Sequence, residues 1–328
     1  MTLEVKAAQA QLADAGPLQS VLHPAGQDAA IIGQFAWVLF IAAAVIFVAV
    51  MTLLAFSLRR HARPPRAGLW IAGAGIAFPV VVLSALLGWS TWRSAELRPQ
   101  GSSHALAISA TARMWWWEVR YRDPASGTEF ATANEIHVPV GQPVYLGLNA
   151  ADVIHSLWIP ALAGKRDMIP GRVTGLTLRA DKPGIYRGQC AEYCGIQHAR
   201  MALHVVAHAP AEFEAWLASQ ARPAAQAAGT LAERGRTAFL DQRCQTCHTI
   251  RGVTEGTPDH ASAGLGPDLT HIGSRMQIGA GTLRNHRGTL AAWIADPQAA
   301  KRGVFMPAAA GIDDESLRAL AAWLEALK

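Results

Sequence analysis

The chain has 328 residues, enough for two or three domains, and 51% of them are hydrophobic while only 16% are charged. This composition is richer in apolar residues than that of most soluble proteins and indicates a part embedded in a membrane. The formal net charge of +5 is not gathered into one basic run or helix, which argues against a nucleic-acid-binding protein. The sequence also lacks the catalytic triad, phosphate-binding loop or paired carboxylates that would suggest a hydrolase or a transferase.

The N-terminal third predicts a transmembrane hairpin. Residues 1–30 are polar, and we expect an extracytoplasmic tail without an ordinary signal peptide. Two uncharged stretches follow, Phe35–Leu58 and Leu69–Trp89, and each is long enough to cross a bilayer as a helix. By the positive-inside rule, the four arginines between them place this loop in the cytoplasm: Arg59, Arg60, Arg63 and Arg66. The hairpin is therefore expected over residues 31–95, with both chain ends outside.

Residues 96–220 show short, β-branched apolar runs that are separated by glycine and proline. These runs predict a compact β-barrel or sandwich with antiparallel strands, closed by a short helix over residues 211–220. Residues 221–229, with the sequence ARPAAQAAG, form a linker that we expect to be flexible. Such a tether would let the last domain meet the β domain at a high effective concentration.

Soft metal ligands are concentrated in one segment of the β domain. Two thiols, an imidazole and a thioether fall within twelve residues: Cys190, Cys194, His198 and Met201. This combination selects copper over hard cations, and it argues against a disulfide or a structural zinc site. A second imidazole has to come from another strand, and His155 is the candidate, with Asp152 as an acceptor that would orient it. Three more histidines lie in alternating β patterns typical of packing or surface positions: His137, His204 and His208.

The spacing C-x-E-x-C-x-x-x-H-x-x-M, with V-I-H-S upstream, resembles the dinuclear copper site of cytochrome c oxidase subunit II. The resemblance covers roughly residues 20–220 and implies two transmembrane helices followed by a cupredoxin-like β-barrel. It implies a dinuclear copper (CuA) centre bridged by the two cysteines and completed by four further ligands: His155, His198, Met201 and the backbone carbonyl of Glu192. It also implies that the Glu192 carboxylate helps to hold a magnesium ion at the boundary with subunit I.

Three consecutive tryptophans follow Met114 and resemble the aromatic segment through which this family receives electrons. Trp115 or Trp116 is the expected point at which electrons enter. The plainer interpretation is that the rings pack the barrel. Since side chains alternate along a strand, Trp115 and Trp117 would then share one face.

Residues 230–328 have a helical apolar period and predict a small all-α domain. Asp313 or Asp314 is expected to cap the last helix. One face of this helix is apolar and should lie in the core: Leu317, Leu320, Trp323, Leu324 and Leu327.

This last domain contains the C-x-x-C-H motif, in which two thiols attach a haem c and the histidine ligates its iron: Cys244, Cys247 and His248. Met306, just before Pro307, resembles the ligand loop of class I cytochromes c, and a methionine ligand raises the haem potential. Met276 is the second choice. Three histidines are further alternatives: His260, His271 and His286. The segment Gly266–Leu269 resembles the one whose proline carbonyl supports the histidine ligand, which indicates Pro267.

Together these features predict subunit II of a caa-type haem-copper oxidase with a fused class I cytochrome c. We expect a bacterial inner-membrane protein with its copper and haem domains in the periplasm. Electrons would come from cytochrome c or the cytochrome bc complex and pass through haem c and CuA to subunit I, which reduces oxygen and translocates protons. Subunit III is expected as a further partner.

Two alternatives remain at this stage. One is the electron-input subunit of a copper-containing nitric oxide reductase, and the other is a membrane-anchored electron carrier without a catalytic partner. The chain also departs from many relatives in one respect. They carry a glutamate near the start of the second transmembrane helix that is associated with proton uptake, whereas Leu69–Trp89 has no acidic residue.

Overall fold

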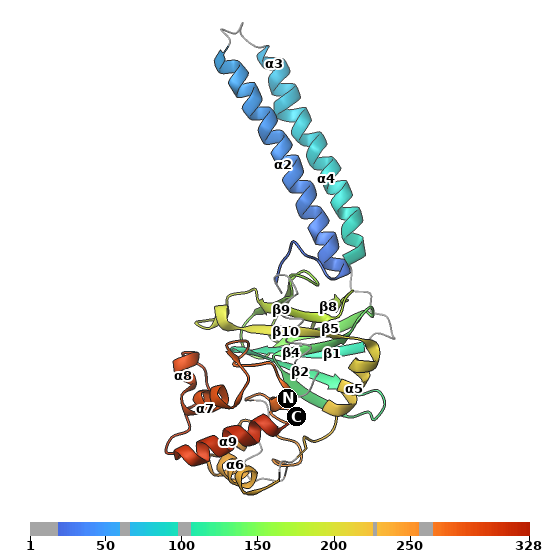
Figure 1. Cartoon of the computed structure of the whole chain (residues 1–328). Coiled ribbons are helices and arrows are strands. Elements are labelled where there is room, and N and C mark those ends of the chain that lie inside the picture. Colours follow the sequence, from blue (N-terminus) through green and yellow to red (C-terminus); the bar gives the residue numbers. More distant parts are fainter. Residues whose placement is uncertain (1–18, 60–65, 98–105, 226–227, 256–264) are drawn as a thin grey trace.

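The computed structural model describes residues 19–59, 66–97, 106–225, 228–255 and 265–328 (Figure 1). Most of the expected N-terminal tail, much of the arginine loop, two linker residues and His260 lie outside the described residues. A long helical hairpin stands on a β-sandwich, and a small helical domain packs beside the sandwich on the side remote from the hairpin. This arrangement confirms the multidomain organisation, while the residue boundaries between the domains stay predictions.

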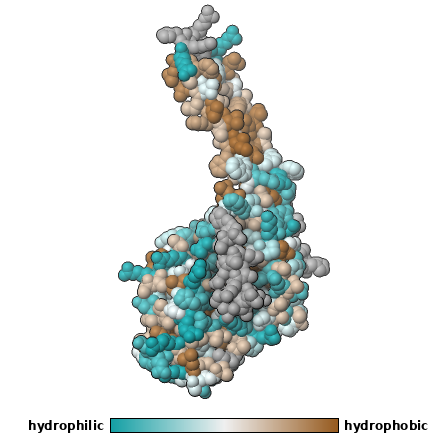
Figure 2. Space-filling view, in the orientation of Figure 1, coloured by the Kyte–Doolittle hydropathy of each residue, from teal (hydrophilic) through white to brown (hydrophobic). Residues whose placement is uncertain are grey.

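The hairpin consists of two long apolar helices. The first is α2 (Gln27–Arg59), and the second is built from α3 (Ala67–Trp70), a π-helical segment (Ile71–Ala77) and α4 (Phe78–Ser94). Both are long and apolar enough to cross a membrane. The π-helical segment ends just before Pro79, whose ring would clash with the carbonyl four residues earlier in a regular α-helix. The hydrophobic surface of the hairpin, brown in Figure 2, is suited to lipid or to other membrane helices.

The sandwich contains two five-stranded sheets, in the orders β3-β2-β1-β5-β8 and β4-β10-β9-β6-β7. Their strands are β1 (Leu106–Arg113), β2 (Trp116–Arg122), β3 (Glu129–Ala133), β4 (Glu135–Pro139), β5 (Val144–Ala150), β6 (His155–Trp158), β7 (Arg166–Met168), β8 (Thr174–Leu178), β9 (Gly184–Cys190) and β10 (Ala202–His208). The expectation of antiparallel pairing throughout is wrong, because β1 pairs with β5 and β4 pairs with β10 in parallel. Alternating hydrophobicity predicts which face of a strand is buried, but it does not identify the neighbouring strand.

The core of the sandwich lies between the two sheets. Strand β5 alternates buried and partly buried residues, as expected for a strand with one face in the core. The helix predicted after the last strand is present as α5 (Pro210–Gln220), which buries Phe213 and Leu217 against the sandwich. A fully buried tryptophan, Trp117, and the buried leucines Leu148 and Leu203 belong to the same core.

The C-terminal domain is built around two crossing helices. It contains α6 (Thr230–Asp241), α7 (Arg287–Ala295), α8 (Pro297–Ala300), α9 (Asp314–Ala326) and a short pair of strands, β11 (Gln277–Ile278) and β12 (Leu283–Arg284). Helices α6 and α9 meet at Gly235, where a Cβ atom would lie 2.4 Å from the carbonyl oxygen of Ala319. Asp313, not Asp314, caps α9 by accepting hydrogen bonds from the backbone of Glu315 and Ser316. The two-residue strands are a small addition to the all-α domain predicted.

The C-terminal domain also contacts the sandwich directly. The backbone N–H of Ala202 in β10 donates to the carbonyl of Ala280 at 3.0 Å, and the N–H of Met276 donates to the buried carboxylate of Glu135 at 2.7 Å. The sequence predicts a tether between the two domains. The structure adds a packed interface, which a linker composition cannot indicate.

Candidate copper and haem sites

Strand pairing assembles the candidate copper ligands. His155 is the first residue of β6 and Cys190 is the last residue of β9, and these two strands are neighbours in the second sheet. The remaining candidates follow in the loop between β9 and β10: Cys194, His198 and Met201. The sheet thus brings His155 to Cys190, which is 35 residues further along the chain.

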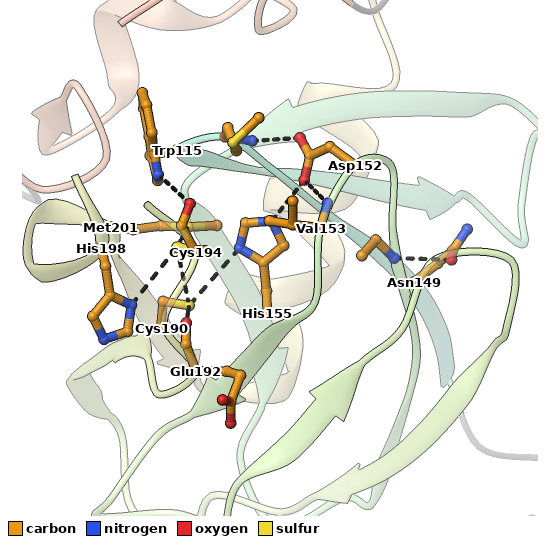
Figure 3. Close-up of polar contacts among 12 residues, drawn as sticks. Trp115, Asn149, Asp152, Val153, His155, Cys190, Glu192, Cys194, His198 and Met201 are labelled. Atoms are coloured by element: carbon orange, nitrogen blue, oxygen red, sulfur yellow. Dashed lines mark hydrogen bonds and ion pairs between the residues drawn. The ribbon is translucent and has the colours of Figure 1, made fainter. Parts of the chain in front are cut away.

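The side chains of these residues converge on the two cysteines (Figure 3). The sulfur atoms of Cys190 and Cys194 are 3.8 Å apart. His155 Nδ1 is 3.8 Å from the Cys190 sulfur, and His198 Nδ1 is 3.6 Å from the Cys194 sulfur. The thioether sulfur of Met201 is 3.9 Å from that of Cys194. Two sulfurs flanked by an imidazole on either side and a thioether form a soft donor set that fits copper.

Glu192 lies within this loop and contributes two different groups. Its backbone carbonyl oxygen is 3.2 Å from the Cys190 sulfur, so the carbonyl belongs to the same cluster of donors. Its carboxylate points away from the cysteines (Figure 3), lies 3.7 Å from the ammonium of Lys165 and is 43% exposed. The carboxylate is therefore available to a group outside the copper cluster.

A hydrogen-bond network that runs from the buried His155 ring to the surface fixes this side chain. Its Nε2 is 2.7 Å from Asp152 Oδ1, which leaves Nδ1 directed at Cys190, and the second oxygen of Asp152 accepts from the Met114 backbone at 2.7 Å. Burial lowers the pKa of His155, but hydrogen bonds to Asp152 and Cys190 outweigh it and raise the pKa to about 9. The hydrogen bond from the Cys194 thiol lowers the pKa of Cys190, while the same coupling raises the pKa of Cys194. Copper would require both sulfurs as thiolates, so metal binding would release the remaining thiol protons.

The three tryptophans occupy different environments. Trp115 lies in the turn before β2, and its indole N–H donates to the carbonyl of Cys194 at 2.8 Å. A Cβ atom at Gly195 would lie 2.9 Å from the Trp115 ring, so glycine is needed for this close approach. Trp117 is buried in the core, and Trp116 lies partly exposed beneath the guanidinium of Arg113. Of the three rings, only that of Trp115 contacts the copper-ligand loop.

The other histidines of the sandwich lie in its packing. His137 Nδ1 and His208 Nε2 are 2.8 Å apart, and the His137 ring stacks on Trp216 with centroids 4.0 Å apart. His204 is buried in β10, and burial lowers its pKa. The rings of His137 and His208 thus form a cluster with Trp216 of α5.

The haem motif occupies a short 3-10 turn, Cys244–Thr246, directly after α6. His248 Nδ1 is 2.7 Å from the carbonyl of Pro267, the partner that the sequence indicates, and this contact leaves Nε2 for iron. A Cβ atom at Gly266 would lie 2.6 Å from the His248 ring, so a larger residue there would displace the ring. Burial lowers the pKa of His248 and favours the neutral imidazole that ligates metals.

Met306 and Met276 are used differently. Met306 packs against the same hydrophobic core as Cys244, and its sulfur accepts a hydrogen bond from the indole of Trp293 at 3.2 Å. Met276 contributes its backbone N–H to Glu135 at the domain interface. Two histidine alternatives have other roles, since His286 caps α7 and His271 lies 2.9 Å from the carbonyl of Arg222. Met306 as the second iron ligand stays a prediction.

Comparisons with known proteins match both domains that carry these candidate sites. The family model "Cytochrome C oxidase subunit II, periplasmic domain" matches residues 123–208, and the model "Cytochrome c" matches residues 232–328. Cytochrome c oxidase subunit 2 of Alkalihalophilus pseudofirmus is 34% identical over 259 residues, which cover 79% of this chain and 72% of the relative. The chain belongs to the cytochrome c oxidase subunit 2 family.

The subunit 2 of Bacillus subtilis is 31% identical over 68% of this chain, which spans 63% of that relative. The solved periplasmic domain of subunit II of cytochrome oxidase from Bradyrhizobium japonicum is 34% identical, with a TM-score of 0.33 over 35% of this chain and 92% of that chain. Family membership makes this chain the cytochrome-carrying subunit II of a haem-copper oxidase, an oxidoreductase in which subunit I is its partner. The two matched domains imply CuA and haem c as its cofactors.

Three residues of subunit II lie at these sites without a signal in the sequence. Trp293 contacts Met306, while Lys301 and Phe305 reach Trp115 from the cytochrome domain. A lone lysine and aromatic residues at helical spacing are ordinary features of a small domain. Trp293 reaches its site only through the fold of the C-terminal domain, and Lys301 and Phe305 reach theirs only because this domain packs on the sandwich.

Asp152→Asn is expected to lower the copper affinity of subunit II by roughly 10- to 100-fold, because an amide holds His155 less well than a carboxylate does. Copper content after dialysis against graded chelator measures this effect. Asp167→Asn is the matched control, since Asp167 is about half exposed and makes only a long contact to Lys165. Unchanged retention of copper in the Asp152 variant would contradict this role.

Proposed function

We propose that the chain accepts electrons in its cytochrome domain, passes them to its copper domain and delivers them to subunit I. The observation that carries the proposal is the position of Trp115, which contacts the copper-ligand loop through Cys194 and the cytochrome domain through Phe305. When bound, haem c and the dinuclear copper would each take up and release one electron at a time. The protein side chains hold these groups, exclude water from them and fix the distance between the two domains.

The proposed copper ligands are the residues that converge on the cysteine pair: His155, Cys190, Cys194, His198, Met201 and the carbonyl of Glu192. The proposed haem residues are Cys244, Cys247, His248 and Met306. We assign the electron-accepting role to Trp115 rather than Trp116, because only Trp115 touches the copper-ligand loop. The sequence alone does not distinguish Trp115 from Trp116 as the point of electron entry.

Further parts of the proposal concern an additional metal ion, the partner subunits, the electron donor and the membrane. The exposed carboxylate of Glu192 is proposed to help hold a magnesium ion against subunit I. Subunit III is a second proposed partner, and cytochrome c or the cytochrome bc complex is the proposed external donor. The proposed location is a bacterial inner membrane, with the arginines beside α2 and α3 on the cytoplasmic side and the sandwich and cytochrome domain in the periplasm.

Purification of the tagged subunit with its native partners tests this function. We expect reduced-minus-oxidised spectra with haem a beside haem c, together with cyanide-sensitive oxygen consumption. Haem b with nitric oxide turnover would instead indicate an electron-input subunit of a nitric oxide reductase. Purification without a second haem would indicate a carrier without a catalytic partner.

A further inference from the structure

The segment Ala300–Phe305, here named the docking loop, joins the cytochrome domain to the copper-ligand loop. It begins at the last residue of α8 and directly precedes Met306. Two of its carbonyls accept hydrogen bonds from the loop that carries Cys194: Arg200 donates to Ala300 at 2.7 Å, and Gln197 donates to Arg302 at 2.6 Å. The segment next to the proposed haem ligand is therefore bound to the segment that contains the proposed copper ligands.

Lys301 lies at the centre of this contact. It is only 1% exposed, and its ammonium donates to the carbonyl of Trp115 at 2.8 Å and to that of Gly279 at 2.9 Å. One acceptor belongs to the copper domain and the other to the cytochrome domain. Within the described part of the chain, no carboxylate pairs with this ammonium. A buried charge is costly unless it is hydrogen-bonded, so Lys301 is satisfied in this position only while the two domains are docked.

Phe305 provides the second contact of the docking loop. Its ring stacks on that of Trp115, with centroids 5.9 Å apart and planes inclined by 18°. Phe305 is 72% exposed, whereas Trp115 is 7% exposed, so the phenylalanine covers the tryptophan from outside. Phe305 is bonded to Met306, and Trp115 is hydrogen-bonded to Cys194, which makes a short series of contacts between the two sites.

We propose that Lys301 is an intramolecular latch and Phe305 a positioning residue, which together hold the cytochrome domain in one docked position on Trp115. The inference rests on the proposed electron-transfer function and adds that the cytochrome domain has one fixed position on the copper domain. An electron lost by the cytochrome domain is gained by the copper domain, while Lys301 and Phe305 exchange neither electrons nor protons. Because the domain covers Trp115, an external donor delivers electrons to the cytochrome domain and not to Trp115 itself.

Docking is tested on the full chain with its cofactors by hydrogen exchange. The amides of Met276 and Ala202 report it, because each donates a hydrogen bond across the interface. Lys301→Met removes the ammonium but keeps most of the side-chain volume, and we expect these amides to exchange about 10-fold faster or more. Lys182→Met, at an exposed lysine of the copper domain, is the matched control and leaves the exchange unchanged. Wild-type protection in Lys301→Met would overturn the latch.

Positioning is tested by the rate of electron transfer from haem c to copper after flash reduction. Phe305→Ala is expected to slow this step by roughly 10-fold or more while the protection of Met276 and Ala202 persists. Phe305→Trp, which keeps a ring over Trp115, should retain most of the rate, and Leu231→Ala at an exposed leucine of α6 should match the wild type. Haem and copper spectra confirm that each variant is loaded.

The outcomes separate this inference from the proposed function. If the wild-type chain carries both cofactors but shows no transfer between them, the proposed function fails. If the wild type transfers electrons and Phe305→Ala transfers them equally fast, the positioning role fails and the function stands.

Discussion

Cys194→Ser will remove the dinuclear copper centre while haem c stays attached. The sulfur of Cys194 lies at the centre of the proposed ligands, within 3.9 Å of the sulfurs of Cys190 and Met201 and of the His198 ring. A hydroxyl is a harder donor than a thiolate and would hold copper less well at this position. We expect copper per chain to fall to background after chelator treatment, measured by elemental analysis and by electron paramagnetic resonance.

The reciprocal variant is the control for this result. Cys247→Ser should weaken or abolish covalent haem attachment and leave the copper content unchanged, since the two cysteine pairs lie in different domains. Haem staining after denaturation measures attachment in both variants. A Cys194→Ser protein that keeps wild-type copper content and spectrum would show that the copper site lies elsewhere.

Met306→His will lower the midpoint potential of haem c. A thioether ligand favours reduced iron, whereas an imidazole stabilises the oxidised form. We expect a decrease of about 0.2 V, within the roughly 0.8 V range over which axial ligands set haem potentials. Because haem c of lower potential accepts electrons less readily from the external donor, oxygen consumption by the intact complex should also fall. A spectroscopic redox titration of the purified complex measures the potential.

Met276→Leu is the matched control, because the structure uses the backbone of Met276 and not its sulfur at the interface. The haem potential should stay at the wild-type value in this variant. A large shift in Met276→Leu with none in Met306→His would exchange the roles of the two methionines.

The local parts of both sites could be predicted from the sequence. The cysteines, His198 and Met201 fall within twelve residues, and the haem motif spans five, so the donor types and their spacing are visible without a fold. The hairpin was equally accessible, because uninterrupted apolar stretches of this length have few uses outside a membrane. The sequence indicates His155 as a candidate for the missing imidazole, and only the pairing of β6 with β9 brings its ring to Cys190.

Only the tertiary structure shows which strands pair and which side chains from distant segments are in contact. The parallel pairs of the sandwich, the contact of Trp115 with Cys194 and the position of Met306 beside Trp293 all join residues that no local pattern connects. Lys301 is the clearest case, since a lysine in a short loop is ordinarily solvated, and here it is buried between two domains. The sequence of a segment determines which chemical groups it carries. Packing determines which groups of distant segments are removed from water together. The contacts between the haem domain and the copper domain therefore depend on the packing.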